Sequence, residues 1–261
     1  MDLNNTMEKK TILVSGAYSD MAKTTLKLLK KQYNFVLLGR DFNKITEVIT
    51  THLTSSDVKL TCVGDISDEI SVRKMADHLR NSNIRLSGIV NFCGGQPVVE
   101  NIHQLNISHL QTEINTRVIG NVNIVKEFHP FLNNGASIVI INGILSKLPE
   151  PNFLCGSIST AAVRSLVKCL SKQFSPTIRV NAINPCASDT KMKDKLLSFL
   201  SKNSGISLNE LEDGITNKIP MGRLCSPTDI ANCVNFLLSD NSSFITGISI
   251  DIDGGYNNSI N

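Results

Sequence analysis

Short apolar runs alternate along this chain with longer segments of helical period. The runs are rich in Val and Ile and nearly continuous in apolarity, which is typical of strands buried on both faces of a parallel sheet. They cover residues 11–15, 35–39, 58–63, 86–92, 136–142, 177–184 and 247–253. Apolar residues recur every three to four positions over residues 21–31, 41–53, 67–80, 105–128, 152–174 and 227–239, which predicts helices. The alternation predicts an α/β fold with a doubly wound, seven-stranded parallel sheet flanked by helices.

One stretch, residues 186–225, does not follow this rhythm. It is amphipathic and flanked by glycine and proline, so it is compatible with a helical flap over a substrate site and equally with surface decoration. The polar residues 1–10 are predicted to form a flexible N-terminus. Because the chain has no internal repeat or linker, residues 1–261 are predicted to form a single domain.

The composition narrows the possible function classes. The 26 basic and 23 acidic residues give a net charge of +3 and form no basic block, which argues against a nucleic-acid partner. The seven cysteines include no C-x-x-C pair, which is typical of reduced thiols. No segment resembles a signal peptide or approaches the roughly 20 apolar residues of a membrane span. These features predict a cytoplasmic protein with no membrane partner.

The first turn between a strand and a helix reads LVSGAYSDMA over residues 13–22. In doubly wound folds this turn holds the phosphates of a nucleotide on backbone N–H groups at the start of the helix. Glycines are needed there because a Cβ would keep the phosphates away. Only Gly16 is present, and no G-x-G-x-x-G occurs in the first sixty residues. Taken alone, the turn is weak evidence for nucleotide binding.

Other motifs match one family along most of the chain. They are Ser15 and Gly16 in the opening turn, Asp65 in GDISD, NFCG at 91–94, INTRVIGNV around Asn115, RVNAINPCASDT at 179–190, and the segments 222–240 and 244–255. In this order and spacing the chain resembles the short-chain dehydrogenases/reductases, and is closest in pattern to their 3-oxoacyl-[acyl-carrier-protein] reductases. The resemblance implies a Rossmann-like fold, nicotinamide-dependent oxidoreductase chemistry on a small-molecule substrate, and a homo-dimer or homo-tetramer.

The resemblance also implies which residues would hold the cofactor. Arg40 follows the second strand without a preceding acid and looks like an acceptor for a 2′-phosphate, which favours NADP over NAD. Asp65 matches the residue that binds the adenine amino group, and Thr190 matches one on the nicotinamide side. The cofactor-binding set is Ser15, Gly16, Arg40, Asp65, Asn91, Gly94 and Thr190. Structural roles without a ligand stay open for the same residues. Arg40 could be a solvated side chain at the end of a strand, and Thr190 could cap a helix. Asp65 and residues 91–94 could simply form turns.

The opening turn departs from the family pattern at two positions. Asp20 stands where the family has its second glycine, and Ala22 where it has its third. A carboxylate suits the first turn of a helix, but a pyrophosphate would use the same position. Two like charges about 4 Å apart repel by about 1 kcal/mol in water and by more where water is excluded. We therefore expect weakened or absent NADP binding unless Asp20 turns outward and either Mg²⁺ on the ligand or Lys23 compensates.

The catalytic positions depart further. The family donates a proton from a tyrosine whose pKa is lowered by a lysine four residues later, and a serine thirteen residues before the tyrosine binds the substrate oxygen. When CGSISTAAVRSLV is aligned on Ala-Ala-Val at 161–163, these positions hold Gly156, Thr160 and Gly143. Asn115 is then the only match to the catalytic tetrad.

Several alternatives to this interpretation stay open. A shift of one residue would put the thiol of Cys155 at the tyrosine position, and Lys147 could swing in from a loop. None of the three tyrosines, at positions 18, 33 and 256, is expected near this helix. Cys93, Cys155 and Cys186 could converge as a redox or zinc cluster, although buried, inert thiols are commoner and no metal site is predicted.

Two functions follow from these residues. The first is a pseudoenzyme of the family that has lost standard carbonyl reduction and acts as a binding or assembly subunit. The second is an active NAD(P)-dependent oxidoreductase with a relocated proton donor.

Overall fold

A computed structural model describes residues 9–95 and 98–258 of the chain, and its centre is one sheet of parallel strands. The order of the strands is β3-β2-β1-β4-β5-β6-β7. Their bounds are β1 Lys10–Ser15, β2 Tyr33–Gly39, β3 Val58–Val63, β4 Leu86–Asn91, β5 Leu132–Ile141, β6 Ile178–Pro185 and β7 Ser249–Ile252. This arrangement confirms the predicted doubly wound, Rossmann-like fold. The order reverses between β1 and β4, where ligands bind in such sheets.

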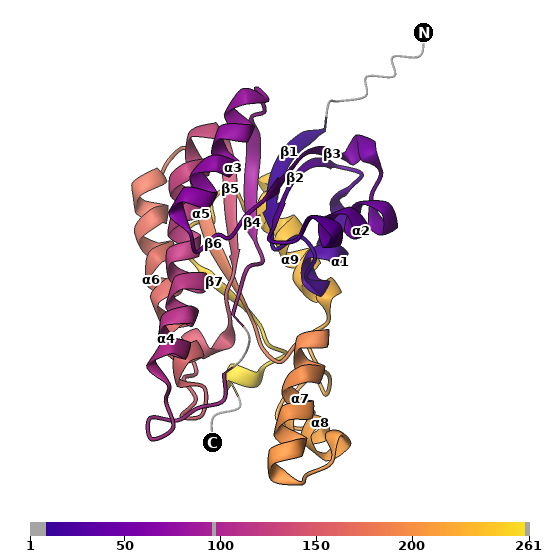
Figure 1. The fold of residues 1–261 in the computed structure, drawn as a ribbon, viewed down its shortest axis with the longest axis vertical. Helices are drawn as coiled ribbons and strands as arrows, with labels where there is room; N and C mark the ends of the chain where they lie inside the picture. The colour runs from indigo at the N-terminus through magenta and orange to yellow at the C-terminus, as the bar shows by residue number, and fades with distance from the viewer. Residues whose placement is uncertain (1–8, 96–97, 259–261) are drawn as a thin grey trace.

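Helices cover both faces of the sheet (Figure 1). The helices α3 (Glu69–Asn81), α5 (Gly120–Phe128) and α6 (Leu154–Phe174) bury one apolar core, which includes Phe128, Ile138 and Val163. The helices α1 (Asp20–Leu29), α2 (Phe42–His52) and α9 (Pro227–Leu238) bury the other, which includes Leu26, Phe35 and Val234. The strands are apolar on both faces because each face packs against one of these cores.

The predicted helix over 105–128 is present but interrupted. It consists of α4 (Ile107–Glu113), a π-helix (Ile114–Ile119) and α5. Insertions of this kind are common at functional sites because they change the direction of the side chains around them. The interruption lies opposite the first turns of α6, since Ser159 of α6 contacts Glu113.

The irregular stretch 186–225 contains two helices, α7 (Lys191–Ser204) and α8 (Leu208–Thr216). They project together from the body of the molecule beyond the carboxyl ends of the strands (Figure 1). The helical character predicted for this stretch is confirmed, and we call α7 and α8 the flap. Lys193 of α7 binds Glu212 of α8 at 2.9 Å and so joins the two helices.

The boundary predicted for the flexible N-terminus is wrong at its end. Residues 1–8 lie outside the described part of the chain, but Lys10 already begins β1. Lys9 forms an ion pair with Asp57 at 3.0 Å. Within the two described ranges, no helix has the length and apolar character needed to cross a membrane.

Candidate functional site

The turn after β1 lies against the end of β4. Gly16 has a φ of +67°, and a Cβ on it would lie 3.0 Å from the backbone nitrogen of Cys93 and the carbonyl carbon of Phe92. An L-residue would therefore be strained there and would also collide with the backbone. The single family glycine that the chain keeps is the one that this close approach requires.

A chain of buried polar side chains runs from this turn into α5. The Ser15 hydroxyl donates to Oδ1 of Asn91, which also accepts from the Cys93 N–H at 2.9 Å. Asn91 Nδ2 donates to Asn121 Oδ1 at 2.7 Å, and Asn121 Nδ2 donates to the carbonyl of Arg117 at 2.6 Å. Ser15 and Asn91 are almost completely buried. Their side chains therefore position the turn and the π-helix.

Arg40 and Asp65 lie together at the ends of β2 and β3. Arg40 Nη1 is 3.6 Å from Asp65 Oδ2. A hydrogen bond with Tyr18, and to a smaller extent the charge of Asp65, raise the pKa of Arg40. Partial burial alone would raise the pKa of Asp65, but hydrogen bonds from Ser67 and the charge of Arg40 lower it overall. Both groups are charged at neutral pH, and the guanidinium is largely exposed. A cationic side chain is therefore available at the carboxyl ends of β2 and β3.

Ala22 and Asp20, the two residues of the opening turn that depart from the family pattern, have different surroundings. Ala22 is fully buried and packs in the core under α1. Asp20 begins α1, and its Oδ2 accepts a hydrogen bond from the backbone N–H of Lys191 at 2.9 Å. Thr190 occupies the N-cap position of α7, but its hydroxyl donates to the carbonyl of Ser188 at 3.4 Å instead of capping the helix. Asp20 and the predicted nicotinamide-side threonine are thus brought together.

The three positions expected to be catalytic also come together. A Cβ on Gly143 would lie 3.6 Å from Cγ2 of Thr160, which is ordinary van der Waals contact. The Thr160 hydroxyl donates to the carbonyl of Gly156 at 2.6 Å, one turn earlier in α6. A Cβ on Gly156 would meet Leu145 at 3.0 Å. Gly143 therefore lies beside Thr160, and the three residues carry no group that ionises near neutral pH.

The side chain of Asn115 is exposed on the π-helix, which gives no support to its predicted catalytic role. The buried polar residues lie on either side of it. Glu113 is 3% exposed, and its Oε2 accepts from Arg117 Nε at 2.6 Å. Arg117 Nη2 donates to the carbonyl of Gly95 at 3.2 Å, beside Gly94. The sequence analysis does not predict this ion pair, although the i, i+4 spacing of Glu113 and Arg117 is typical of ion pairs on a helix.

The three cysteines singled out in the sequence have separate surroundings. Burial raises the pKa of Cys93 to about 11, near Ser15 and Arg40. Burial and the charges of Glu100 and Glu113 raise the pKa of Cys155, which makes this thiol a weaker acid than usual. Cys186 lies beside Cys225 on a cavity of about 350 Å³. In the described ranges no group of three or more His, Cys, Asp or Glu side chains could hold a metal ion.

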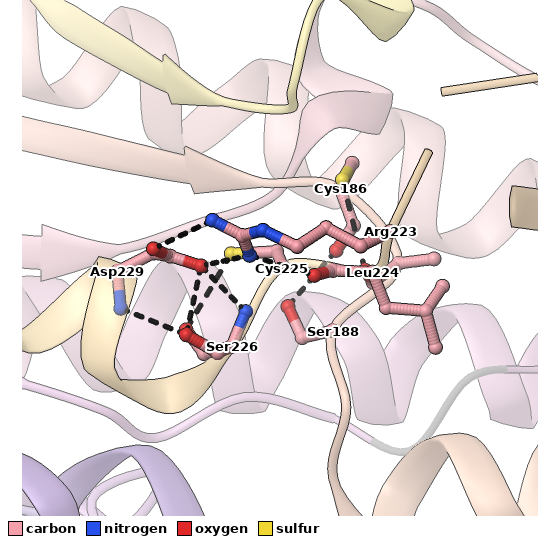
Figure 2. Close-up of polar contacts among 8 residues, drawn as sticks. Cys186, Ser188, Arg223, Leu224, Cys225, Ser226 and Asp229 are labelled. Atoms are coloured by element: carbon pink, nitrogen blue, oxygen red, sulfur yellow. Dashed lines mark hydrogen bonds and ion pairs between the residues drawn. The ribbon is translucent and has the colours of Figure 1, made fainter. Parts of the chain in front are cut away.

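The cavity beside Cys186 is bounded by a tight polar cluster at the start of α9 (Figure 2). Arg223 donates to both carboxylate oxygens of Asp229, at 2.6 and 3.1 Å. Ser226 and Asp229 form a capping box at the first turn of α9. The hydrogen bond from Arg223 is the main reason why the pKa of Asp229 is strongly lowered. The cluster ties the segment around Arg223, which follows the flap, to the first turn of α9.

Two further candidates for a proton donor have defined positions. Lys147 forms an ion pair with Asp251 at 2.7 Å and also donates to the carbonyl of Ser249, so its ammonium is held against β7. Tyr256 lies within electrostatic range of Glu150, on the loop before α6, and of Cys186. Burial, then Glu150, then Cys186 raise the pKa of Tyr256. The expectation that none of the three tyrosines lies near α6 stays a prediction.

A family model described as enoyl-(acyl carrier protein) reductase matches residues 16–257, which is most of the chain. The chain belongs to the short-chain dehydrogenase/reductase (SDR) family. The SDR match includes the flap, the opening turn from Gly16 onwards and all the candidate positions on α6.

Individual SDR relatives agree over nearly the full length. The NADPH-dependent reductase BacG of Bacillus subtilis is 28% identical over 97% of this chain and 100% of its own length. A 3-oxoacyl-[acyl-carrier-protein] reductase of Thermotoga maritima is 24% identical over 95% of this chain and 98% of its own. A solved SDR structure from Francisella tularensis superposes with a TM-score of 0.86 at 25% identity, covering 96% of this chain and 100% of that one.

Proposed function

We propose that this SDR protein binds NADP(H) weakly, has lost standard carbonyl reduction, and acts as a binding or assembly subunit. One observation carries the proposal: Gly143, Gly156 and Thr160 meet at the start of α6, and none of them can donate a proton to a carbonyl oxygen. General acid catalysis by a positioned group contributes about 10²- to 10⁴-fold in rate. A site without the acid, its tuning lysine and the serine should therefore be slow with ketones.

The residues present fit an NADP cofactor in part. Gly16 lets the backbone come close, and Arg40 beside Asp65 offers a guanidinium for a 2′-phosphate. Asp20 does not fit, because its carboxylate, which accepts from the N–H of Lys191, would bring negative charge next to a pyrophosphate bound at the start of α1. When bound, NADP(H) supplies hydride chemistry. This chain would contribute binding through Arg40 and Asp65, and would position the turn through Ser15 and Asn91.

A surface for assembly is available on the helices that lie over one face of the sheet. A groove of about 240 Å³ between α5 and α6 is lined by Val122, Val125, Leu166, Leu170 and Phe174. Val122 is 37% exposed, which is high for an apolar side chain in a helix. We infer that this face pairs with a second copy or with an active SDR homologue in the cytoplasm.

The experiment that tests this proposal combines binding with turnover. NADPH binding is followed by its fluorescence and by thermal shift, and NADPH consumption is measured with acetoacetyl thioesters and simple diketones. We expect weak binding and consumption no faster than in the absence of protein. Consumption well above that control would refute the loss of carbonyl reduction. No binding of NADPH or NADH would refute the nucleotide part.

Tyr256 favours a second candidate function, an active oxidoreductase with a relocated proton donor. Tyr256 follows β7 in the chain, and burial, then Glu150 and Cys186, raise the pKa of its phenol. A phenol is the group that the family uses as its acid, so this position gives the alternative a specific residue to test. Loss of turnover in Tyr256→Phe would support it.

A further inference from the structure

Asp20 joins two helices whose first residues are 171 positions apart in the sequence. It is the first residue of α1, and Ser19 before it caps that helix by accepting from the N–H of Ala22 at 3.3 Å. The Asp20 carboxylate is therefore free to face away from α1. It accepts instead from the N–H of Lys191, the first residue of α7 in the flap.

The flap needs this acceptor because it lacks one of its own. The N-cap residue Thr190 makes no side-chain bond to the first turn of α7. The first N–H groups of a helix have no partner within the helix and carry partial positive charge, so a carboxylate is a favourable cap. Asp20 supplies that cap from the nucleotide turn.

The flap has few other attachments to the body. Leu197 is the one buried residue among those of α7, all of which are described, and α8 has none. The ion pairs of Lys193 reach Asp189 and Glu212, at the start of the flap and within it, so they stiffen the flap without attaching it to α1. Phe199 is 53% exposed, as the projection of the flap in Figure 1 leads one to expect.

We propose that the contact between Asp20 and the Lys191 N–H is a latch that holds the flap on the nucleotide turn of the free protein and that a dinucleotide must displace. The proposal rests on the proposed nucleotide binding and explains why that binding is weak. A pyrophosphate needs the N–H groups at the start of α1, and it brings negative charge next to the Asp20 carboxylate. The latch and the pyrophosphate therefore exclude each other.

Two substitutions of Asp20 separate the effect of its negative charge from the effect of its hydrogen bond with the Lys191 N–H. Asp20→Gly restores the family residue and removes both, whereas Asp20→Asn removes the charge but keeps an oxygen that can accept from Lys191. Asp194→Asn is the matched control, because Asp194 is also an acid in the first turn of α7 but is 66% exposed and pairs with Lys193. The same full-length proteins are titrated with NADPH and, without ligand, digested briefly with trypsin, which cuts after Lys191, Lys195 and Lys202 in the flap.

We expect Asp20→Gly to bind NADPH at least tenfold more tightly than the unmodified chain and to be cut in the flap several-fold faster. Asp20→Asn should bind more tightly but be cut at the unmodified rate, and Asp194→Asn should change neither. Circular dichroism checks that each variant is folded. If Asp20→Gly does not fold, the NADPH affinity of Asp20→Asn shows whether the Asp20 charge opposes binding. Unchanged affinity in both Asp20 variants, or an unchanged cutting rate in a folded Asp20→Gly, overturns the latch. If no protein in the series binds NADPH while Asp20→Gly is cut faster, it is the proposed nucleotide function that fails.

Discussion

Restoring the three family residues on and opposite α6 tests the central proposal directly. The triple variant Gly143→Ser, Gly156→Tyr, Thr160→Lys should gain NADPH-dependent ketone reduction. A Cβ at Gly143 has room, since the nearest side-chain atom is 3.6 Å away. A Cβ at Gly156 meets Leu145 Cδ1 at 3.0 Å, and this atom ends a flexible side chain that can move by a few tenths of an ångström.

The cost in stability can be estimated from the same positions. Replacing a helical glycine such as Gly156 gains about 0.5–1 kcal/mol of backbone entropy, which offsets the shift of Leu145. Thr160 is 2% exposed, so a lysine there must extend its ammonium towards the open side or pay a desolvation penalty of several kcal/mol. We expect a net loss of about 1–3 kcal/mol, which lowers the melting temperature but leaves the protein folded.

The loss of NADPH absorbance in the presence of a diketone measures the ketone reduction gained by the triple variant. One recovered acid is worth about 10²- to 10⁴-fold in rate, so we expect consumption at least about 10²-fold above the unmodified chain. The control variant Gly143→Ala, Gly156→Phe, Thr160→Met has side chains of similar volume but lacks the hydroxyl, phenol and ammonium groups. If the folded triple variant binds NADPH but is no faster than this control, Gly143, Gly156 and Thr160 are not the catalytic positions and the reasoning is refuted.

Three other predictions follow from single contacts. Arg40→Ala should weaken NADPH binding about tenfold, which is about 1.4 kcal/mol, and leave NADH almost unchanged; equal effects on both would show that Arg40 does not meet a 2′-phosphate. Tyr256→Phe should leave NADPH consumption at the level of the unmodified chain, whereas a turnover that falls about 10²-fold would identify Tyr256 as a relocated acid. Since its pairing with Arg223 lowers the pKa of Asp229 far below the ordinary value of 3.8, the stability that this pair contributes is fully present above 3.8 and is lost as the pH falls from there through the much lower folded pKa. Asp229→Asn should therefore cost about 1 kcal/mol at pH 7 and progressively less as the pH is lowered below 3.8, as read from melting temperatures.

The fold could be predicted because its strands are buried on both faces. All seven residues of β2 are buried, and its residues 35–39 form an uninterrupted apolar run that cannot be confused with a half-exposed strand. The hydrophobic pattern is missing at the start of β5. This strand begins at Leu132, four residues before its predicted start, and its residues 133–135 are exposed, polar or glycine. The register with β4 shifts over these residues, and they carry no hydrophobic pattern.

Candidate site positions could be named from the sequence where motifs are local, as with Gly143, Gly156 and Thr160. Contacts that join distant segments could not be predicted. The hydrogen bond from Lys191 to Asp20 depends on how the flap returns to the turn after β1. Asn115 shows the limit of a motif match, which names a residue but does not indicate that a π-helix will carry it with its side chain exposed.

Several polar side chains around the candidate site have partners within the protein. A buried polar group without a partner costs about 1–3 kcal/mol. Asp20 caps α7, Glu113 pairs with Arg117, and the Thr160 hydroxyl donates within α6. The described residues hold three buried side-chain oxygens without a partner, and two of these belong to Asn142 and Ser146, which flank Gly143. A ligand that donates hydrogen bonds to these two oxygens would therefore be stabilised beside Gly143.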